Sequence, residues 1–179
     1  MALADELALM DREYPLDGRP VWNIITLAHS GSRSVKEYLE AQGRHTRRLY
    51  LQSHWHDKQF FVDLLNSTQK TVIVVRDPLL VILSTKERKD DSLKRLLIAI
   101  KDFYSLNWTK ANQVIALELT PGLPIVGSQS YQDKIDYISG NIAAIRSRRP
   151  EIDAMLTQLQ TVCRPKLEAR GYTNLIWWT

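Results

Sequence analysis

Residues 21–39 read VWNIITLAHSGSRSVKEYL, and the character of the residues changes sharply within this stretch. The first seven residues are mostly β-branched or apolar and lack a strict polar/apolar alternation, which is typical of a strand covered on both faces. Small and hydroxyl-bearing residues follow, and helical spacing of apolar residues resumes at Val35. The stretch therefore predicts a buried strand, a tight turn and a helix.

This arrangement is a candidate anion cradle. A strand, a Gly/Ser turn and a helix start direct several backbone N–H groups and the positive helix end at one spot, which suits phosphate or sulfate. The nucleotide pattern GxxxxGK[ST] is absent, because Thr26 stands five residues before Gly31, and Ser32 and Arg33 follow it. Ordinary ATP or GTP hydrolysis is disfavoured. An ordinary strand-to-helix connection explains the same residues, so this stretch alone leaves both interpretations open.

A second buried strand is predicted at residues 71–75, TVIVV, and the chain continues as RDPLLVILS. Arg76 follows the strand at its carboxyl end, where α/β sheets bind ligands, and an Asp-Pro pair suits a helix start. Ser84 lies about two helical turns beyond Arg76, near enough to share an anion with it. A helix start with a surface arginine is the alternative interpretation.

Together these stretches resemble the sulfotransferases that use 3′-phosphoadenosine 5′-phosphosulfate. The segment HSGSRSVKEYL is similar to the family's strand, loop and helix that grip the 5′-phosphosulfate. The segment VVRDPLLVILS is similar to the strand followed by RDPxxxxxS, which grips the 3′-phosphate. LYLQSHW resembles the strand ending in KTH, whose histidine is the catalytic base in the cytosolic branch. The resemblance covers residues 21–85.

The resemblance implies a sulfuryl transfer from 3′-phosphoadenosine 5′-phosphosulfate, as co-substrate, to a hydroxyl or amine acceptor, without a metal. His54 is the expected base, with His56 as second choice, and protonated His29 is expected at the leaving phosphate. His29 stands where the family usually has Lys or Arg. The residues expected to hold the nucleotide are Ser30, Gly31, Ser32, Arg33, Ser34, Arg76 and Ser84.

Two other functions remain open on the same residues. The first is a catalytically inactive nucleotide- or protein-binding module on the sulfotransferase fold, which His29 and the short chain favour. The second is an atypical nucleotide kinase, against which the missing phosphate-gripping lysine argues. Arg146, Arg148 and Arg149 form a late basic cluster that belongs either to the solvated surface, which we favour, or to the nucleotide site.

The two apolar runs, each followed by a helix, predict a three-layer α/β fold with a central, mostly parallel sheet of four or five strands. The runs are expected side by side at its centre, with helices on both faces. Asp57 is expected to cap a helix, and Asp91 or Ser92 another. The remaining elements are expected as helices at 2–13, 58–66, 89–110, 129–147 and 150–170, a basic loop at 42–48, and strands at 49–52, 113–119 and within 120–128.

The composition suits one domain over residues 1–179, with 44% hydrophobic residues for its core. The 24 Lys and Arg against 20 Asp and Glu leave a charge of +4, which argues against a nucleic-acid partner and suits a small anionic ligand. Acidic residues interrupt the N-terminus, and no apolar run approaches the roughly 20 residues of a membrane span, so we expect neither signal peptide nor membrane partner. A single cysteine, Cys163, fits the reducing cytoplasm.

Overall fold

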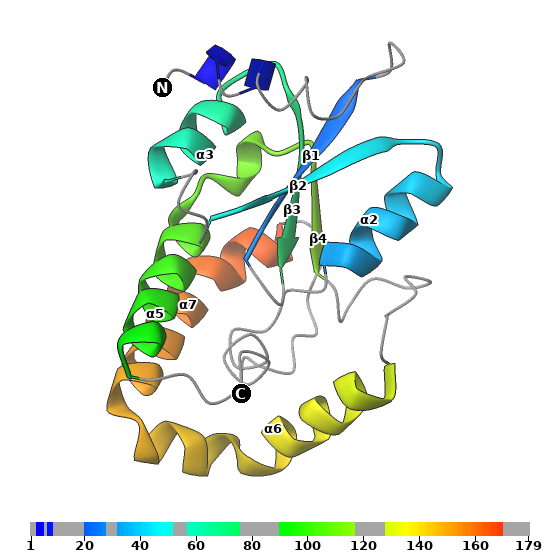
Figure 1. Ribbon diagram of the computed structural model, residues 1–179. Coiled ribbons are helices and arrows are strands. Elements are labelled where there is room, and N and C mark those ends of the chain that lie inside the picture. Colours follow the sequence, from blue (N-terminus) through cyan, green and yellow to red (C-terminus); the bar gives the residue numbers. More distant parts are fainter. Residues whose placement is uncertain are drawn as a thin grey trace.

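The computed structural model describes residues 3–5, 7–8, 20–27, 32–51, 57–75, 90–116 and 128–169. Its centre is a four-stranded sheet in the order β2-β1-β3-β4, and every strand pair is parallel (Figure 1). The strands are β1 (Val21–Thr26), β2 (His45–Tyr50), β3 (Lys70–Val75) and β4 (Gln113–Ala116). The predicted α/β fold is confirmed, with the two apolar strands, β1 and β3, adjacent at the centre.

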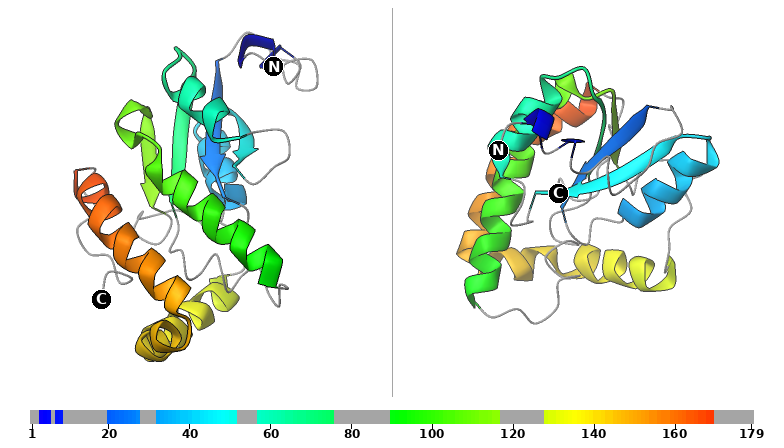
Figure 2. Two further views of the ribbon diagram at one scale, coloured as in Figure 1. Left: turned by 90° about the vertical axis from the view of Figure 1, so that its left-hand side faces the viewer. Right: turned by 45° about the horizontal axis from the view of Figure 1, so that its top comes forward.

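Helices cover both faces of this sheet, as predicted. Figures 1 and 2 show α2 on one side of the sheet and α3 and α5 on the other, while α7 packs against α5 and contacts α6. Figure 1 shows α6 below the carboxyl ends of the strands. The helices are α2 (Ser32–Ala41), α3 (Lys58–Leu65), α5 (Asp90–Ser105), α6 (Ser128–Arg148) and α7 (Pro150–Glu168), with a 3-10 turn, η1 (Trp108–Lys110).

Strands β1 and β3 carry the core of the domain. Ile24 and Ile25 in β1 are fully buried, as are residues 72–75 in β3. Successive side chains of a strand point to opposite faces, so burial of consecutive residues requires cover on both sides. This is the pattern that the apolar runs predicted.

Helix α2 ends in a Schellman motif that sends the chain back toward the sheet. Gly43 has a φ of 82°, a left-handed conformation that favours glycine. Its N–H donates to the carbonyl of Glu40, and the N–H of Arg44 donates to that of Leu39 (2.9 and 3.2 Å). The turn satisfies carbonyls at the end of the helix and starts β2 immediately afterwards.

The predicted cap of α3 is confirmed, whereas that of α5 is wrong. The Asp57 side chain accepts a hydrogen bond from the backbone N–H of Phe60 at 3.0 Å. Helix α5 runs over Asp90–Ser105, so Asp91 and Ser92 lie inside the helix and not before it. Its apolar stripe is core, as expected: the buried members are Leu96, Ile100, Phe103 and Tyr104. The helix ends at Ser105 and not at residue 110 as expected, and buried Trp108 lies in the 3-10 turn η1.

Strand β2 corrects the expectation of a basic loop at residues 42–48 and a strand at 49–52. The strand runs over His45–Tyr50 and pairs with β1 along its whole length. It lies at the sheet edge, where charged residues are common because one side of the strand faces solvent. Its Arg48 is exposed, whereas Arg47 is buried and hydrogen-bonded. The basic composition concealed the strand.

The remaining elements agree with expectation where the structure describes them. Strand β4 covers the first part of the expected strand at 113–119, and α6 and α7 meet at Pro150. The expected strand within 120–128 lies almost wholly outside the described residues, and of the expected helix at 2–13 only residues 3–5 and 7–8 are described, all helical. One domain over residues 1–179 stays a prediction. Among the residues described, no helix has the length and apolarity to cross a membrane.

A buried polar link ties the three strands β2, β1 and β3 together. Asn23, fully buried in β1, accepts a hydrogen bond from Arg47 Nε (2.5 Å), its register partner in β2. The same Asn23 donates through Nδ2 to the carbonyl of Lys70 in β3 at 2.9 Å. Buried polar groups are tolerated when hydrogen-bonded and costly when left unpaired. Asn23 therefore supports burial of the Arg47 charge.

We expect Asn23→Ala to lower the free energy of unfolding by about 2–4 kcal/mol, because it removes an acceptor from a buried arginine and a donor from the carbonyl of Lys70. Urea denaturation at pH 7 measures the change. Asn141→Ala is the matched control, since exposed Asn141 donates to a carbonyl of its own helix, and we expect less than about 1 kcal/mol there. Equal effects of both substitutions would contradict a special role of Asn23.

Candidate functional site

The strand order creates a topological switch point between β1 and β3. The chain leaves β1 through α2 to reach β2 on one side, and later returns to β3 on the other side of β1. The connecting helices therefore lie on opposite faces of the sheet. Open α/β sheets bind ligands outside the carboxyl ends of the strands at such a switch point, and both predicted anion-binding stretches follow these two strands in the sequence.

The first turn of α2 contains three of the residues predicted to bind nucleotide. Ser32, Arg33 and Ser34 are its first residues. Backbone N–H groups in the first turn of a helix point along the helix axis, where they can contact an anion. This helix end lies at the carboxyl edge of the sheet, because α2 follows the end of β1 (Figure 1). The other predicted site residues lie outside the described residues: His29, Ser30, Gly31, His54, His56, Arg76 and Ser84.

The two serine side chains of this turn are buried against the protein. Ser32 is 5% exposed and Ser34 is 3% exposed. Ser32 Oγ lies 3.4 Å from the Tyr50 hydroxyl, and either oxygen can be the donor. Tyr50 is the last residue of β2, so this contact joins the start of α2 to the carboxyl end of the neighbouring strand.

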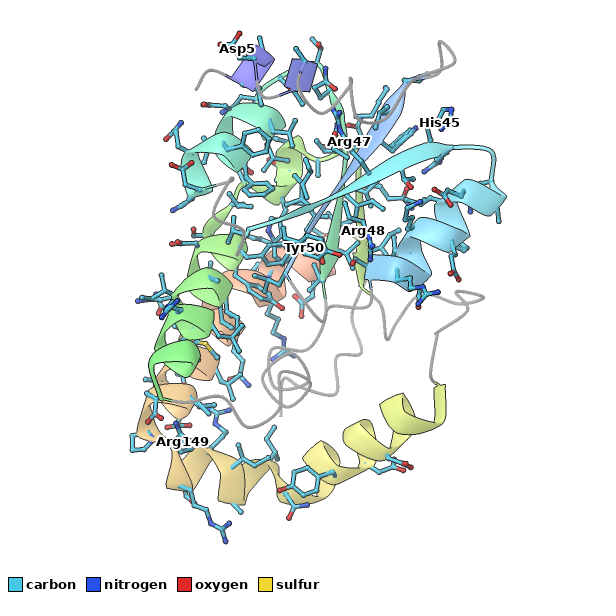
Figure 3. The ribbon with its side chains drawn as sticks, in the orientation of Figure 1. Asp5, His45, Arg47, Arg48, Tyr50 and Arg149 are labelled. Carbon is cyan, nitrogen blue, oxygen red and sulfur yellow. The ribbon has the colours of Figure 1, made fainter. Side chains whose placement is uncertain are left out.

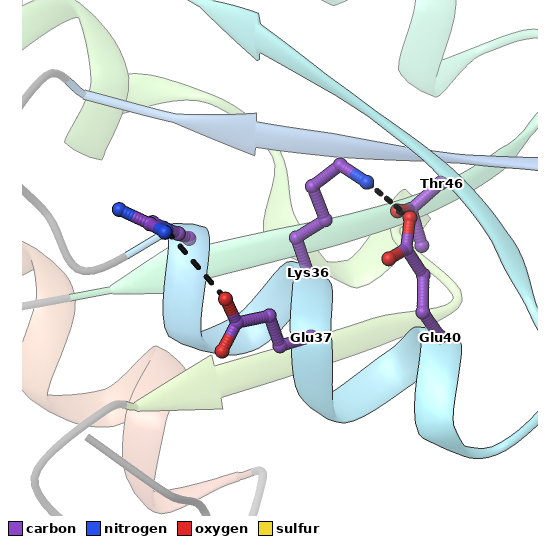
Figure 4. A network of polar contacts seen from close by, with 5 residues as sticks. Lys36, Glu37, Glu40 and Thr46 are labelled. Carbon is purple, nitrogen blue, oxygen red and sulfur yellow. Dashed lines mark hydrogen bonds and ion pairs between the residues drawn. The ribbon is translucent and has the colours of Figure 1, made fainter. Parts of the chain in front are cut away.

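Arg33 points differently from the two serines. Its side chain is 72% exposed, and its Nε lies 3.5 Å from Glu37 Oε1, one helical turn along α2 (Figure 4). A guanidinium on this outer face is solvated and neutralised by its own helix. The backbone of Arg33 is therefore the part that the first turn offers to an anion.

The outer face of α2 is anchored to β2 by Glu40. Lys36 Nζ donates to Glu40 Oε1, and the Thr46 hydroxyl donates to the same oxygen at 3.1 Å (Figure 4). The hydrogen bond from Lys36 is the main cause that holds the pKa of Glu40 below its usual 4.5, against the opposing effect of burial. The Lys36 charge and the Thr46 hydrogen bond act in the same direction.

Because the folded-state pKa is lowered, Glu40 stabilises the fold above pH 4.5, and this contribution disappears as the pH falls through the folded-state pKa. We expect Glu40→Gln to cost about 0.5 kcal/mol at pH 7, a small value because the pair is substantially exposed. Urea denaturation between pH 7 and pH 3 measures the difference from wild type, which should narrow below pH 4.5. Glu37→Gln, whose pair stays within α2, is the control. A difference that stays constant with pH would contradict this role.

Two residues at the site were missed by sequence reasoning. Arg48 and Tyr50 project from the same face of β2, and the Arg48 guanidinium carbon lies 5.8 Å from the centre of the Tyr50 ring (Figure 3). Register pairs them with Ile24 and Thr26, and the contact between Tyr50 and Ser32 identifies this face as the one that carries α2. The sequence signal that could have identified both residues is the strand-like alternation of side chains in residues 45–50, HTRRLY, which the basic-loop interpretation overlooked.

The late arginines lie at the corner between α6 and α7. Arg146 Nε lies 2.5 Å from Asp153 Oδ1, and its NH2 group donates to Thr157 Oγ1 at 2.7 Å. Arg149 Nε donates to Glu151 Oε1 at 2.7 Å, and Figure 3 labels Arg149 at this corner. These contacts fix the angle between two helices, which supports the surface interpretation of the cluster.

Comparison with protein-family models, with curated proteins and with solved structures found no significant match. Within the ranges that the structure describes, no group of three or more His, Cys, Asp or Glu side chains could hold a metal ion. The candidate site therefore rests on the geometry of β1, α2, β2 and β3 and on the residues that follow these strands.

Proposed function

We propose that this protein binds 3′-phosphoadenosine 5′-phosphosulfate and transfers its sulfuryl group to a hydroxyl or amine acceptor. The observation that carries the proposal is the parallel pairing of β1 and β3 at the switch point. They pair in register up to Ile25 and Ile73, so both strands end at the same edge. The phosphosulfate-like stretch follows one strand and the RDP stretch follows the other.

The start of α2 supplies the groups that a transferring sulfuryl group needs. Negative charge grows on the departing 5′-phosphate as its bond to sulfur breaks, and oriented N–H groups at a helix start stabilise such charge. Under the proposal the Gly31 and Ser32–Ser34 backbone and protonated His29 face this phosphate. Alignment and electrostatics suffice for this chemistry, as in phosphoryl transfer.

The acceptor oxygen or nitrogen attacks sulfur, the bond from sulfur to the 5′-phosphate oxygen breaks, and the acceptor proton passes to a general base. We assign this base to His54, which follows Tyr50 by four residues, beyond the carboxyl end of β2. A neutral imidazole near pH 7 is suited to accept the proton. The products are the sulfated acceptor and adenosine 3′,5′-bisphosphate.

We expect Arg76→Ala to weaken binding of adenosine 3′,5′-bisphosphate by about tenfold or more, since a charged hydrogen bond to phosphate contributes roughly 1.5–3 kcal/mol. Binding of adenosine 5′-phosphate should change little, because it lacks the 3′-phosphate. Isothermal titration calorimetry measures both. Arg164→Ala, an exposed arginine of α7 paired with Glu168, is the control. Equal losses for both nucleotides would mean that Arg76 acts on the fold, and selective binding of ATP with Mg²⁺ would favour the kinase.

We expect His54→Ala to lower the rate of sulfate transfer about 10²-fold or more with donor affinity unchanged. The measurement is transfer from labelled donor to a panel of phenols, sugars and peptides. His45→Ala is the matched control, because His45 starts β2 at the opposite edge of the sheet. If the wild-type protein binds the donor but transfers nothing across the panel, the enzyme proposal fails in favour of the inactive binding module. His29, which stands in place of a permanent cation, favours that alternative.

A further inference from the structure

The outer edge of β2 presents backbone groups that have no partner among the described residues. The sheet ends at β2, which pairs with β1 along its whole length (Figure 1). The Leu51 N–H donates to the Thr26 carbonyl at 3.1 Å, so the odd-numbered residues of this strand point their backbone groups toward β1. In a parallel pair the residues between them point the other way. The N–H and C=O groups of Thr46, Arg48 and Tyr50 therefore face outward.

This edge is regular over its full length. Every residue of β2 has a register partner in β1, so no bulge interrupts the strand, and its sequence HTRRLY contains no proline. Bulges, prolines and covering segments are the common devices that stop a further strand from adding to a sheet edge. A regular edge with free donors and acceptors is the surface used in β-strand addition, where main-chain hydrogen bonds provide affinity.

The side chains that border this edge favour an acidic partner. Arg48 projects to the face of the sheet that carries α2, and it is exposed there. A residue placed opposite Arg48 on an added strand has its side chain on the same face, within reach of an ion pair. The acidic residues of α2, Glu37 and Glu40, are already paired with cations of their own helix. A carboxylate opposite Arg48 therefore meets an exposed cation on this face.

The same geometry disfavours a second copy of this chain as the occupant. An antiparallel pair of two β2 edges, centred on Arg48, places Thr46 opposite Tyr50 and Arg48 opposite Arg48 of the other copy. Like charges directly opposite each other destabilise a strand pair, and charged edge residues are a common device against self-association. The net charge of +4 on each chain acts in the same direction.

We propose that the outer edge of β2 binds an extended acidic peptide segment of a partner protein, which adds a fifth strand to the four-stranded sheet. The backbone of Thr46, Arg48 and Tyr50 forms the hydrogen bonds, and the Arg48 side chain selects a carboxylate at the facing position. This inference does not rest on the proposed function, because it uses the side edge of the sheet and not the carboxyl ends of β1 and β3.

The charge preference is tested with two capped, fluorescein-labelled peptides of about nine residues, one alternating Glu with Val and the other Lys with Val. Fluorescence anisotropy measures their binding to the full chain, and we expect the Glu peptide to bind about tenfold more tightly. Arg48→Glu should weaken binding of the Glu peptide about tenfold and strengthen binding of the Lys peptide. Arg164→Glu makes the same charge change on exposed α7 and should alter both by less than about twofold.

The backbone pairing is tested by N-methylation of the Glu peptide. In an added strand the N–H groups of alternate residues point to β2, and those between them point to solvent. Methylating one alternate set should therefore abolish binding, whereas methylating the other should leave it within about threefold. An antiparallel peptide donates through its Glu residues and a parallel peptide through its Val residues, so the sensitive set reports the strand direction.

The protein side of the pairing is tested at Thr46. Thr46→Pro removes one outward N–H at a position where an edge strand tolerates proline, and we expect the Glu peptide to bind about fivefold more weakly. Thr46→Ala is the matched control, because it removes the hydrogen bond to Glu40 and keeps the N–H, and it should leave binding within about twofold. Circular dichroism verifies that the variants are folded, and the methylated peptides test the pairing without any change to the protein.

Three results would overturn this inference. The first is equal affinity of the wild-type protein for the Glu and Lys peptides, or no binding of either. The second is loss of binding with both methylated sets, or with neither. The third is a wild-type dimer in sedimentation analysis that Thr46→Pro dissociates, because it would assign the edge to a second copy of the chain.

Discussion

The parallel pairing of β1 with β3 is the constraint on which the other elements depend. Both strands are buried on both faces, so each face needs a covering layer, and the crossover connections supply α2 on one side and α3 and α5 on the other. Because the two strands reach the same edge, the segments that follow them start side by side. The arrangement that covers the core therefore also brings the carboxyl ends of β1 and β3 together, which is where open α/β sheets bind ligands.

The buried pair of Asn23 and Arg47 lies where neighbouring strands can satisfy its polar groups. Asn23 bonds to both of its neighbours, and its acceptor oxygen allows β2 to keep a buried arginine. The next residue of β2, Arg48, projects to the other face, where α2 begins. The alternation of a single edge strand therefore separates a buried, hydrogen-bonded arginine, Arg47, from an exposed one, Arg48.

The candidate site combines groups of different origin. In the proposal, helix α2 contributes the backbone of its first turn, β2 contributes Arg48 and Tyr50, and the chain after β3 contributes Arg76. These groups come from three neighbouring strands or their continuations. A phosphate site assembled in this way depends on strand register, because a slip of one residue would turn Arg48 to the opposite face and exchange it with Arg47.

Local patterns in the sequence determined the elements whose signals are short-range. The apolar runs predicted β1 and β3, Asp57 predicted the start of α3, and the apolar stripe predicted the buried face of α5, because burial periodicity and caps act within a few residues. The first part of strand β2, residues 45–48, escaped prediction because its basic residues are tolerated by edge position and by Asn23, which is distant in sequence. Only the tertiary structure decided the contact of Ser32 with Tyr50 and the separate environments of Arg47 and Arg48, since strand pairing brings these residues together.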